Sequence, residues 1–350
     1  MDGQEPEGAS LKRLGVARRK AVSVSQENLV KAEPLQSGKL LPLLLQPSIE
    51  DFDLTAWAAS AREYLAEQLL KHGGILFRGF NLRSPAEFEQ FIRTISGGEL
   101  LDYSYRSTPR TVVSGRIYTS TEYPASHAIP LHNEMAYSRT WPLMICFHCV
   151  RSAQQGGETP IADSRAVYQR IDPKIKETFT RKKVLYVRNY GSGIDLPWQT
   201  VFQTSDKAEV AMYCLNAGIE LEWRDGDRLR TRQVCQAVAA HPVSGEMVWF
   251  NQVHLFHVTS LDSKVRESVF STFAEEDLPR NAYYGDGSHI EPSILDEIRR
   301  IYQEEAIVFP WHDGDLLLLD NMLSAHGRHP YSGARRVIVG MAQHYAPGTL

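Results

Sequence analysis

The hydrophobic positions in the first third of the chain change from helical to extended spacing and back. After Asp53, apolar residues recur every three or four positions until Gly73 interrupts them, which predicts an amphipathic helix. A strand is expected over 75–80, and Ser84-Pro85-Ala86-Glu87 has the form of a capping box with proline at the first helical position. A second helix should follow, with its inner face formed by Phe88, Phe91, Ile92 and Ile95.

Short extended segments dominate the rest of the chain. Two further helices are expected, one over about 163–179 and one that begins at Pro292. Runs of Val, Ile, Leu and aromatic residues between turns predict strands over 141–150, 184–190, 209–216, 232–240, 245–250, 316–320 and 336–344. Many short strands with a few peripheral helices predict a mainly β protein, a double-stranded β-helix of the jelly-roll or cupin-like kind. The mouth of such a fold is a natural position for a metal.

The composition is that of an ordinary globular protein, with 350 residues of which 43% are hydrophobic and 23% charged. We expect one domain over residues 16–350, preceded by a disordered tail over residues 1–15. The net charge of −4 lacks the positive field that binding to nucleic acid or an anionic membrane requires. No apolar stretch approaches the roughly 18 residues of a membrane span and the N-terminus lacks a secretory signal, so a cytoplasmic location is expected.

The four cysteines are too few for a disulfide scaffold. Cys146 and Cys149 have the spacing of a redox or zinc pair. In a strand, however, residues three apart point to opposite faces, and no second pair completes a tetrahedral zinc site. We therefore expect buried or half-buried thiols.

The candidate chemistry lies in His132-Asn133-Glu134 and in His326, which closes the run that starts at Gly314. Residues i and i+2 of an extended segment point the same way, so His132 and Glu134 can reach one ion, and His326 would have to come from a facing strand. Two imidazoles and one carboxylate are the ligand set of a non-haem Fe(II) site with open positions.

A second triplet of this kind, His289-Ile290-Glu291, shows that the pattern also arises by chance. His289 lies in a Gly-Asp-Gly-Ser loop, and Glu291 precedes Pro292, where a helix is expected to begin and acidic residues are common. We do not expect this copy to bind metal. The first copy instead precedes a long strand and the turn Gly156-Gly157-Glu158-Thr159.

These motifs, together with Tyr331-Ser-Gly-Ala-Arg335-Arg336, resemble the taurine dioxygenase group of Fe(II)- and 2-oxoglutarate-dependent oxygenases. Within that group the chain is most similar to syringomycin-biosynthesis-type hydroxylases of nonribosomal peptide clusters, to clavaminate synthase and to asparagine hydroxylases. The resemblance covers residues 15 to 346, with four motifs in the same order. It implies that His132, Glu134 and His326 bind Fe(II), and that O2 and 2-oxoglutarate are consumed.

The resemblance also implies how the cosubstrate is held. The far carboxylate of 2-oxoglutarate needs a cation, for which arginine offers a planar fork. The position of Arg336, ten residues after His326, matches that of the family's arginine, whereas Arg335 should point to the opposite face of the same strand. Thr159 takes the position of a hydroxyl that binds 2-oxoglutarate. The open alternatives are surface arginines and an ordinary turn threonine.

The implied reaction is oxygenation, because halogenases of this chemistry lack the carboxylate ligand that Glu134 supplies. Hydroxylation, epoxidation or desaturation of an amino-acid-like or peptide-like substrate is expected, in the biosynthesis of a specialised metabolite such as an antibiotic. The polar candidates for contact with that substrate are Asn133 and Glu122, which could bind a substrate amine, and Asn251 and His254, for which a packing role is the alternative.

The substrate could be free or tethered to an acyl or peptidyl carrier protein. Arg228, Arg230 and Arg232 would share one face of a strand, where they could dock an acidic carrier or form an ordinary solvated surface. Two other functions stay open at this point. One is a His2Glu zinc hydrolase, which would leave Thr159 and Arg336 without a task, and the other is a non-catalytic cupin-like binding protein.

Overall fold

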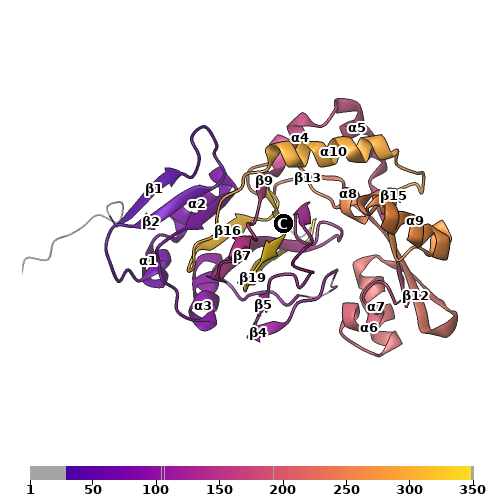
Figure 1. Ribbon diagram of the computed structural model, residues 1–350, viewed down its shortest axis with the longest axis horizontal. Coiled ribbons are helices and arrows are strands. Elements are labelled where there is room, and N and C mark those ends of the chain that lie inside the picture. The colour runs from indigo at the N-terminus through magenta and orange to yellow at the C-terminus, as the bar shows by residue number, and fades with distance from the viewer. Residues whose placement is uncertain (1–28, 104, 106, 192, 348–350) are drawn as a thin grey trace, which may run out of the picture.

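The computed structural model describes residues 29–103, 105, 107–191 and 193–347; the tail expected over residues 1–15 lies outside this part. A large sheet forms its centre (Figure 1). The eight strands of this sheet are, in spatial order, β1 (Val30–Pro34), β2 (Leu43–Pro47), β3 (Gly74–Phe77), β16 (Leu316–Asp320), β7 (Trp141–Arg151), β19 (Arg336–Tyr345), β5 (Ile117–Thr119) and β4 (Val112–Ser114).

A smaller sheet carries the candidate ligands and consists of β6 (Ile129–His132), β17 (Ser324–Arg328) and β9 (Ile161–Asp163). A separate four-stranded sheet contains β11 (Glu220–Arg224), β12 (Arg228–Cys235), β10 (Val184–Tyr190) and β15 (Arg280–Tyr284). Two short pairs complete the strands, β13 (Val238–Ala240) with β14 (Met247–Trp249) and β18 (Tyr331–Ser332) with β8 (Gln155–Gly156).

The four-leucine strand β16 is buried on both faces, which explains its continuous apolar run. It pairs antiparallel with β3 on one side and with β7 on the other. Leu316 and Leu318 pack in the cluster that includes the N-terminal helices, whereas Leu317 and Leu319 pack in the cluster that contains Ile161 of the small sheet. The large sheet is therefore covered by helices on one face and by the small sheet on the other.

The N-terminal helices are α1 (Leu54–Ser60), α2 (Arg62–His72) and α3 (Pro85–Ser96). The expected helix after Asp53 is thus two helices that meet at Ala61. The start of α3 is confirmed, because the Ser84 hydroxyl accepts a hydrogen bond from the Glu87 N–H and Pro85 occupies the first turn. Gly97 ends α3 in the left-handed conformation.

The other helices are α4 (Ser164–Arg170), α5 (Pro173–Lys182), α6 (Trp198–Phe202), α7 (Lys207–Ala217), α8 (Val253–Phe256), α9 (Ser263–Thr272) and α10 (Pro292–Glu305). In Figure 1, α4, α5 and α10 lie together at the top, while α6 and α7 lie beside β12 at the lower right. The single helix expected over 163–179 is divided, because Asp172 caps a new helix that begins at Pro173. The helix expected from Pro292 is confirmed.

The strand expected over 209–216 is wrong. This segment belongs to α7, which begins where the Asp206 side chain accepts a hydrogen bond from the Ala208 N–H and ends at Gly218. Its buried residues, Val210 and Cys214, are four positions apart, which is helical spacing. The strand expected over 232–240 is likewise divided, into the end of β12 and β13.

All four cysteines are buried and free, as expected from the sequence. Among the helices in the described ranges, none has both the length and the apolar character needed to cross a membrane.

Candidate metal and cosubstrate site

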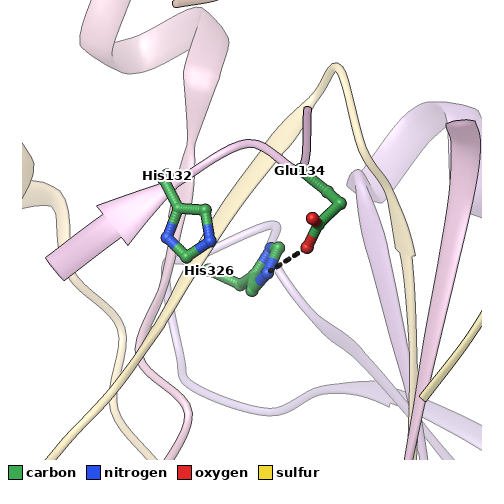
Figure 2. A group of neighbouring side chains, drawn as sticks. All are labelled: His132, Glu134 and His326. Carbon is green, nitrogen blue, oxygen red and sulfur yellow. Dashed lines mark ion pairs between the residues drawn. The ribbon is translucent and has the colours of Figure 1, made fainter. Parts of the chain in front are cut away.

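Three side chains from separate parts of the chain converge at the edge of the small sheet (Figure 2). His132 ends β6, Glu134 follows in the adjoining turn, and His326 lies in the middle of β17. One ligand atom of each residue lies within 4.8 Å of those of the other two. His326 pairs directly with His132 across the antiparallel strands, so the third ligand does come from a facing strand.

Both imidazoles are held in the neutral form that a metal requires. Burial lowers the pKa of His132, although the Glu134 carboxylate opposes the shift. Burial also lowers the pKa of His326 well below its ordinary value, and His132 and Arg110 lower it further. The Nδ1 atom of His132 lies 2.8 Å from the Pro130 carbonyl oxygen, so Nδ1 carries the proton and Nε2 is left as the metal-binding atom.

Glu134 is held by its backbone and by its carboxylate. The Asn321 side chain accepts a hydrogen bond from the Glu134 N–H at 2.7 Å and donates one to the Glu134 carbonyl at 2.9 Å. The carboxylate oxygen Oε2 accepts a hydrogen bond of 2.6 Å from Arg110 and lies 3.9 Å from Nε2 of His326. These contacts fix Glu134 with one oxygen toward the two imidazoles.

The turn between β16 and β17 places His326. The Asp320 carboxylate accepts hydrogen bonds from the N–H groups of Met322 and Leu323, and its other oxygen lies 3.0 Å from Nε2 of His241. At the start of β16, Asp315 forms an ion pair with Arg78 at 2.7 Å. The polar residues of this run are therefore turn and anchor groups that orient the strand that carries His326.

A partly open cavity lies beside the cluster. Its lining residues come from both sheets and the loops between them: Arg110, Ser120, Thr121, Ile129, His132, Phe147, Thr159, His326, Gly327, Arg328, Arg335 and Val337. Two of the three clustered ligands, His132 and His326, thus line this cavity.

The structure places the two neighbouring arginines differently. Arg335 lines the cavity, whereas Arg336 is exposed. Arg335 directly precedes β19, whose pairing with β7 is irregular between Arg336 and Val337, and Val337 lines the cavity together with Arg335. The sequence could not decide between them, because the strand that follows is apolar on both faces.

The Gly156-Gly157 turn makes room for Arg335. Gly157 has a positive φ of 75°, and a Cβ there would lie 2.9 Å from Cδ of Arg335. Its carbonyl accepts a hydrogen bond of 2.9 Å from Nε of Arg335. Burial, followed by repulsion from Arg328, lowers the pKa of Arg335 to about 10, and an anion in the cavity would offset that repulsion. This turn therefore aims a guanidinium at the cavity.

Thr159 lies in the cavity wall, as expected, and is 3% exposed. Its Oγ1 accepts a hydrogen bond of 3.0 Å from the Trp311 indole. Because the indole can only donate, the hydroxyl proton of Thr159 is free to point elsewhere. Thr159 and Arg335 can thus both donate to an anion.

The four expected substrate contacts are not among the residues that line the cavity, and the structure gives them other partners. Asn133 is fully buried and donates to Ser164 and to the Asn321 carbonyl. Asn251 donates to the Ala237 carbonyl, and Glu122 is exposed and accepts from Thr119. His254 lies 2.9 Å from the Leu131 carbonyl and stacks on Tyr302. Asn133, Asn251 and His254 bond to backbone groups here, which favours a packing role, and their contact with the substrate stays a prediction, as it does for Glu122.

Arg228, Arg230 and Arg232 all lie in β12, as expected, but they differ in exposure, and only Arg228 is fully exposed. Arg230 is 3% exposed and forms an ion pair with Asp277, while Arg232 is half-buried near Glu222. The second triplet, His289-Ile290-Glu291, lies in the loop that precedes α10. His289 is exposed and lies beside Glu275, and no other cluster of potential ligands occurs within the described ranges.

Sequence reasoning missed two residues of this site, Arg110 and Asn321. Asn321 directly follows the four-leucine strand, inside the run that ends at His326, where its polarity was a usable signal. Arg110 lies 24 residues before Glu134 in a segment without regular periodicity. Its role depends on a fold contact that no local pattern reveals.

Two facing sheets with a His-Glu-His cluster at their edge define a metal-dependent oxygenase-type site. The sequence model described as "Taurine catabolism dioxygenase TauD, TfdA family" matches residues 33–342. The chain belongs to this family, which confirms the resemblance seen in its motifs. It is a 2-oxoglutarate-dependent dioxygenase, whose cofactor is Fe(II) and whose cosubstrates are 2-oxoglutarate and O2.

Two relatives cover most of the chain. The chain is 40% identical over 308 residues to the dapdiamide synthesis protein DdaC of Enterobacter agglomerans, covering 88% of this chain and 93% of DdaC. It is 33% identical over 293 residues to a clavaminate synthase-like protein of Arabidopsis thaliana, covering 81% of this chain and 85% of that protein.

Solved structures share the fold at low sequence identity. PvcB of Pseudomonas aeruginosa has a TM-score of 0.54 at 17% identity, covering 91% of this chain and 93% of PvcB. A second structure of PvcB, described as "an Fe, alpha-ketoglutarate dependent oxygenase from an isonitrile synthetic pathway", has a TM-score of 0.52 at 18% identity and the same coverage.

Proposed function

We propose that His132, Glu134 and His326 hold one Fe(II) ion, and that the enzyme oxidises an amino-acid-like or peptide-like small molecule in the biosynthesis of a specialised metabolite. The observation that carries this proposal is the convergence of three ligand atoms within 4.8 Å at a cavity that also contains Arg335 and Thr159. Two neutral imidazoles and a carboxylate fit Fe(II), and leave positions open for other ligands.

The remaining residues act on the cosubstrate. Arg335 binds the far carboxylate of 2-oxoglutarate through charge-assisted hydrogen bonds, and the Thr159 hydroxyl donates to the same group. Ser120, whose Oγ lies 3.4 Å from Arg335, supports the guanidinium. When bound, iron supplies the chemistry that couples O2 and the oxidative decarboxylation of 2-oxoglutarate to oxidation of the substrate. Apolar walls such as Phe147 and Val337 limit the access of water.

The outcome is hydroxylation, epoxidation or desaturation, because Glu134 occupies the coordination position that a halide would need. The name of the relative DdaC, a dapdiamide synthesis protein, supports a biosynthetic role. Tethering of the substrate to a carrier protein remains part of the proposal. Arg228, Arg230 and Arg232 do not support it, because Arg230 is buried and paired with Asp277.

We also propose that the two facing sheets constitute a double-stranded β-helix, that residues 16–350 act as a single catalytic domain, and that the protein works in the cytoplasm. Two observations support the first of these statements. β17 pairs antiparallel with β6 and β9, and the large sheet packs against the small sheet that carries the site. Limited proteolysis that leaves one active fragment tests the second.

The test is a screen for substrate-stimulated succinate formation. The purified chain, supplied with Fe(II), 2-oxoglutarate and O2, is given candidate amino acids as free acids and as carrier-bound thioesters. A substrate should raise succinate release, and His132→Ala should abolish the stimulation. Full activity of that variant would contradict the proposed triad. Equal rates with the free acids and with the carrier-bound thioesters would show that the enzyme does not require a carrier protein.

A further inference from the structure

The guanidinium of Arg110 lies next to the metal cluster, in the wall of the same cavity. Arg110 is 6% exposed, and its NH2 group donates to Glu134 while the guanidinium carbon lies 4.5 Å from the centroid of the Tyr103 ring. Its other donor atoms, Nε and NH1, are buried and have no hydrogen-bond partner among the described residues. Two buried donors without a partner, on a cation that borders the cavity, need a hydrogen-bond acceptor.

The other two arginines of the cavity are engaged differently. Arg328 donates to the backbone carbonyls of Tyr123, Pro124 and His127. Arg335 donates to the Gly157 carbonyl and faces the proposed position of 2-oxoglutarate. Only Arg110 contacts a carboxylate, and that carboxylate belongs to a metal ligand.

The charges leave Arg110 without a full counterion once the site is loaded. Glu134 then shares its single negative charge between Arg110 and a doubly charged ferrous ion. The two negative charges of 2-oxoglutarate face the ion and Arg335. The loaded cavity therefore retains an excess of positive charge beside Arg110, and a buried cation is favoured only when it is paired.

We propose that Arg110 binds a carboxylate of the substrate, so that the portion of the substrate that reaches the iron carries a free acid group. This inference rests on the proposed function, because it takes the triad and Arg335 to be occupied by Fe(II) and 2-oxoglutarate. Arginine suits this task because it stays charged when buried and directs its donors from a rigid plane. Arg110 thereby selects acids over the corresponding amides and orients the carbon to be oxidised.

The test uses the full chain loaded with Mn(II) and 2-oxoglutarate, so that no turnover occurs. Two probes of equal size, N-acetylglycine and N-acetylglycinamide, differ only in the carboxylate, and calorimetry measures their dissociation constants. The protein should bind the acid at least about tenfold more tightly than the amide, a difference of about 1.4 kcal/mol. Arg110→Gln should abolish the preference and Arg110→Lys should keep part of it. Arg116→Gln, a change of a half-buried arginine that does not line the cavity, should leave it unchanged.

A second readout separates this inference from the proposed function. Anaerobic Fe(II) and 2-oxoglutarate should give a visible charge-transfer band with the unaltered protein and with Arg110→Gln. Absence of the band in the unaltered protein rejects the proposed function. A band in that protein without a preference for the acid, or with the preference retained in Arg110→Gln, overturns the role of Arg110 alone. Loss of the band only in Arg110→Gln also overturns it, because Arg110 would then serve to hold Glu134.

Discussion

The Asn321 side chain forms hydrogen bonds with both the N–H and the carbonyl of Glu134. One amide thus fixes the backbone of a metal ligand that lies in a turn, where no strand partner could do so. Nδ2 of Asn321 also donates to the Pro142 carbonyl at 2.8 Å, which ties that turn to the start of β7. The position of the carboxylate therefore depends on a residue 187 positions away along the chain.

Asn321→Ala should weaken both stability and metal binding. Leaving buried backbone groups unpaired should lower the free energy of unfolding by about 1–3 kcal/mol, and misplacing Glu134 should weaken Mn(II) affinity by roughly 10–100-fold. Urea unfolding and metal titration measure the two effects. Asn251→Ala is the matched control, because this fully buried amide also bonds only to backbone groups. It should lose stability and keep its metal affinity; equal metal affinity in both variants would contradict the role of Asn321.

The neighbouring arginines should differ in their effect on 2-oxoglutarate. Arg335→Gln should raise the concentration of 2-oxoglutarate needed for half-maximal activity by roughly 10–100-fold, because a hydrogen bond to a charged group is worth about 1.5–3 kcal/mol. Arg336→Gln should leave it unchanged, because Arg336 is exposed. Steady-state titration of the cosubstrate measures both. The reverse pattern would restore Arg336 as the binding residue.

Gly157→Ala should act on the same step through Arg335. The new Cβ would lie 2.9 Å from Cδ of Arg335, and the positive φ of 75° alone should cost about 1–2 kcal/mol for a residue with a side chain. We expect lower stability together with a higher 2-oxoglutarate requirement. Gly226→Ala has a similar φ of 69° and no atom within 4 Å of its Cβ, so it should show the loss of stability alone. An unchanged cosubstrate requirement in Gly157→Ala would show that Arg335 has room to move aside.

Acidification should destabilise the metal-free protein partly through His254. Burial lowers the pKa of His254 to about 3, whereas an unfolded histidine titrates near its ordinary value of about 6.5. Between these values the unfolded chain binds the proton and the folded chain does not, so stability falls as the pH falls, by up to about 1.4 kcal/mol per pH unit. Above that range the histidine contributes no pH dependence.

His254→Gln tests this assignment, because the amide can still donate to the Leu131 carbonyl and does not titrate. Between pH 7 and pH 4 the unfolding free energy of this variant should fall less steeply with pH. The difference in slope should be up to about 1.4 kcal/mol per pH unit, which corresponds to one proton. An identical slope would mean that His254 becomes protonated in the folded state at an ordinary pH.

Local patterns predicted the parts of this molecule that depend on short-range chemistry. These parts are the capping residues of α3, the amphipathic α10, the four-leucine run of β16 and the three clustered ligands with their spacing. The helix α7 was missed, because Ala211-Met-Tyr-Cys-Leu215 also fits a strand and its capping residues Asp206 and Gly218 were overlooked.

Long-range contacts account for the rest. Whether Arg335 or Arg336 faces the cavity depends on which side of β19 meets the small sheet, and both sides are apolar. Asn133, Asn251 and His254 look like free polar groups in the sequence. In the structure, their side chains form hydrogen bonds with backbone carbonyls of other segments. Arg110 contacts Glu134 from a loop whose sequence shows no hydrophobic periodicity, so no local pattern predicts this contact.

The central claim is that His132, Glu134 and His326 form one iron site that also admits 2-oxoglutarate. The most direct measurement is the visible spectrum of the protein after anaerobic addition of Fe(II) and 2-oxoglutarate, compared with His326→Ala. The account predicts a weak charge-transfer band that requires both additions and is absent from the variant. A protein that stays colourless, or a band that persists without His326, would contradict it.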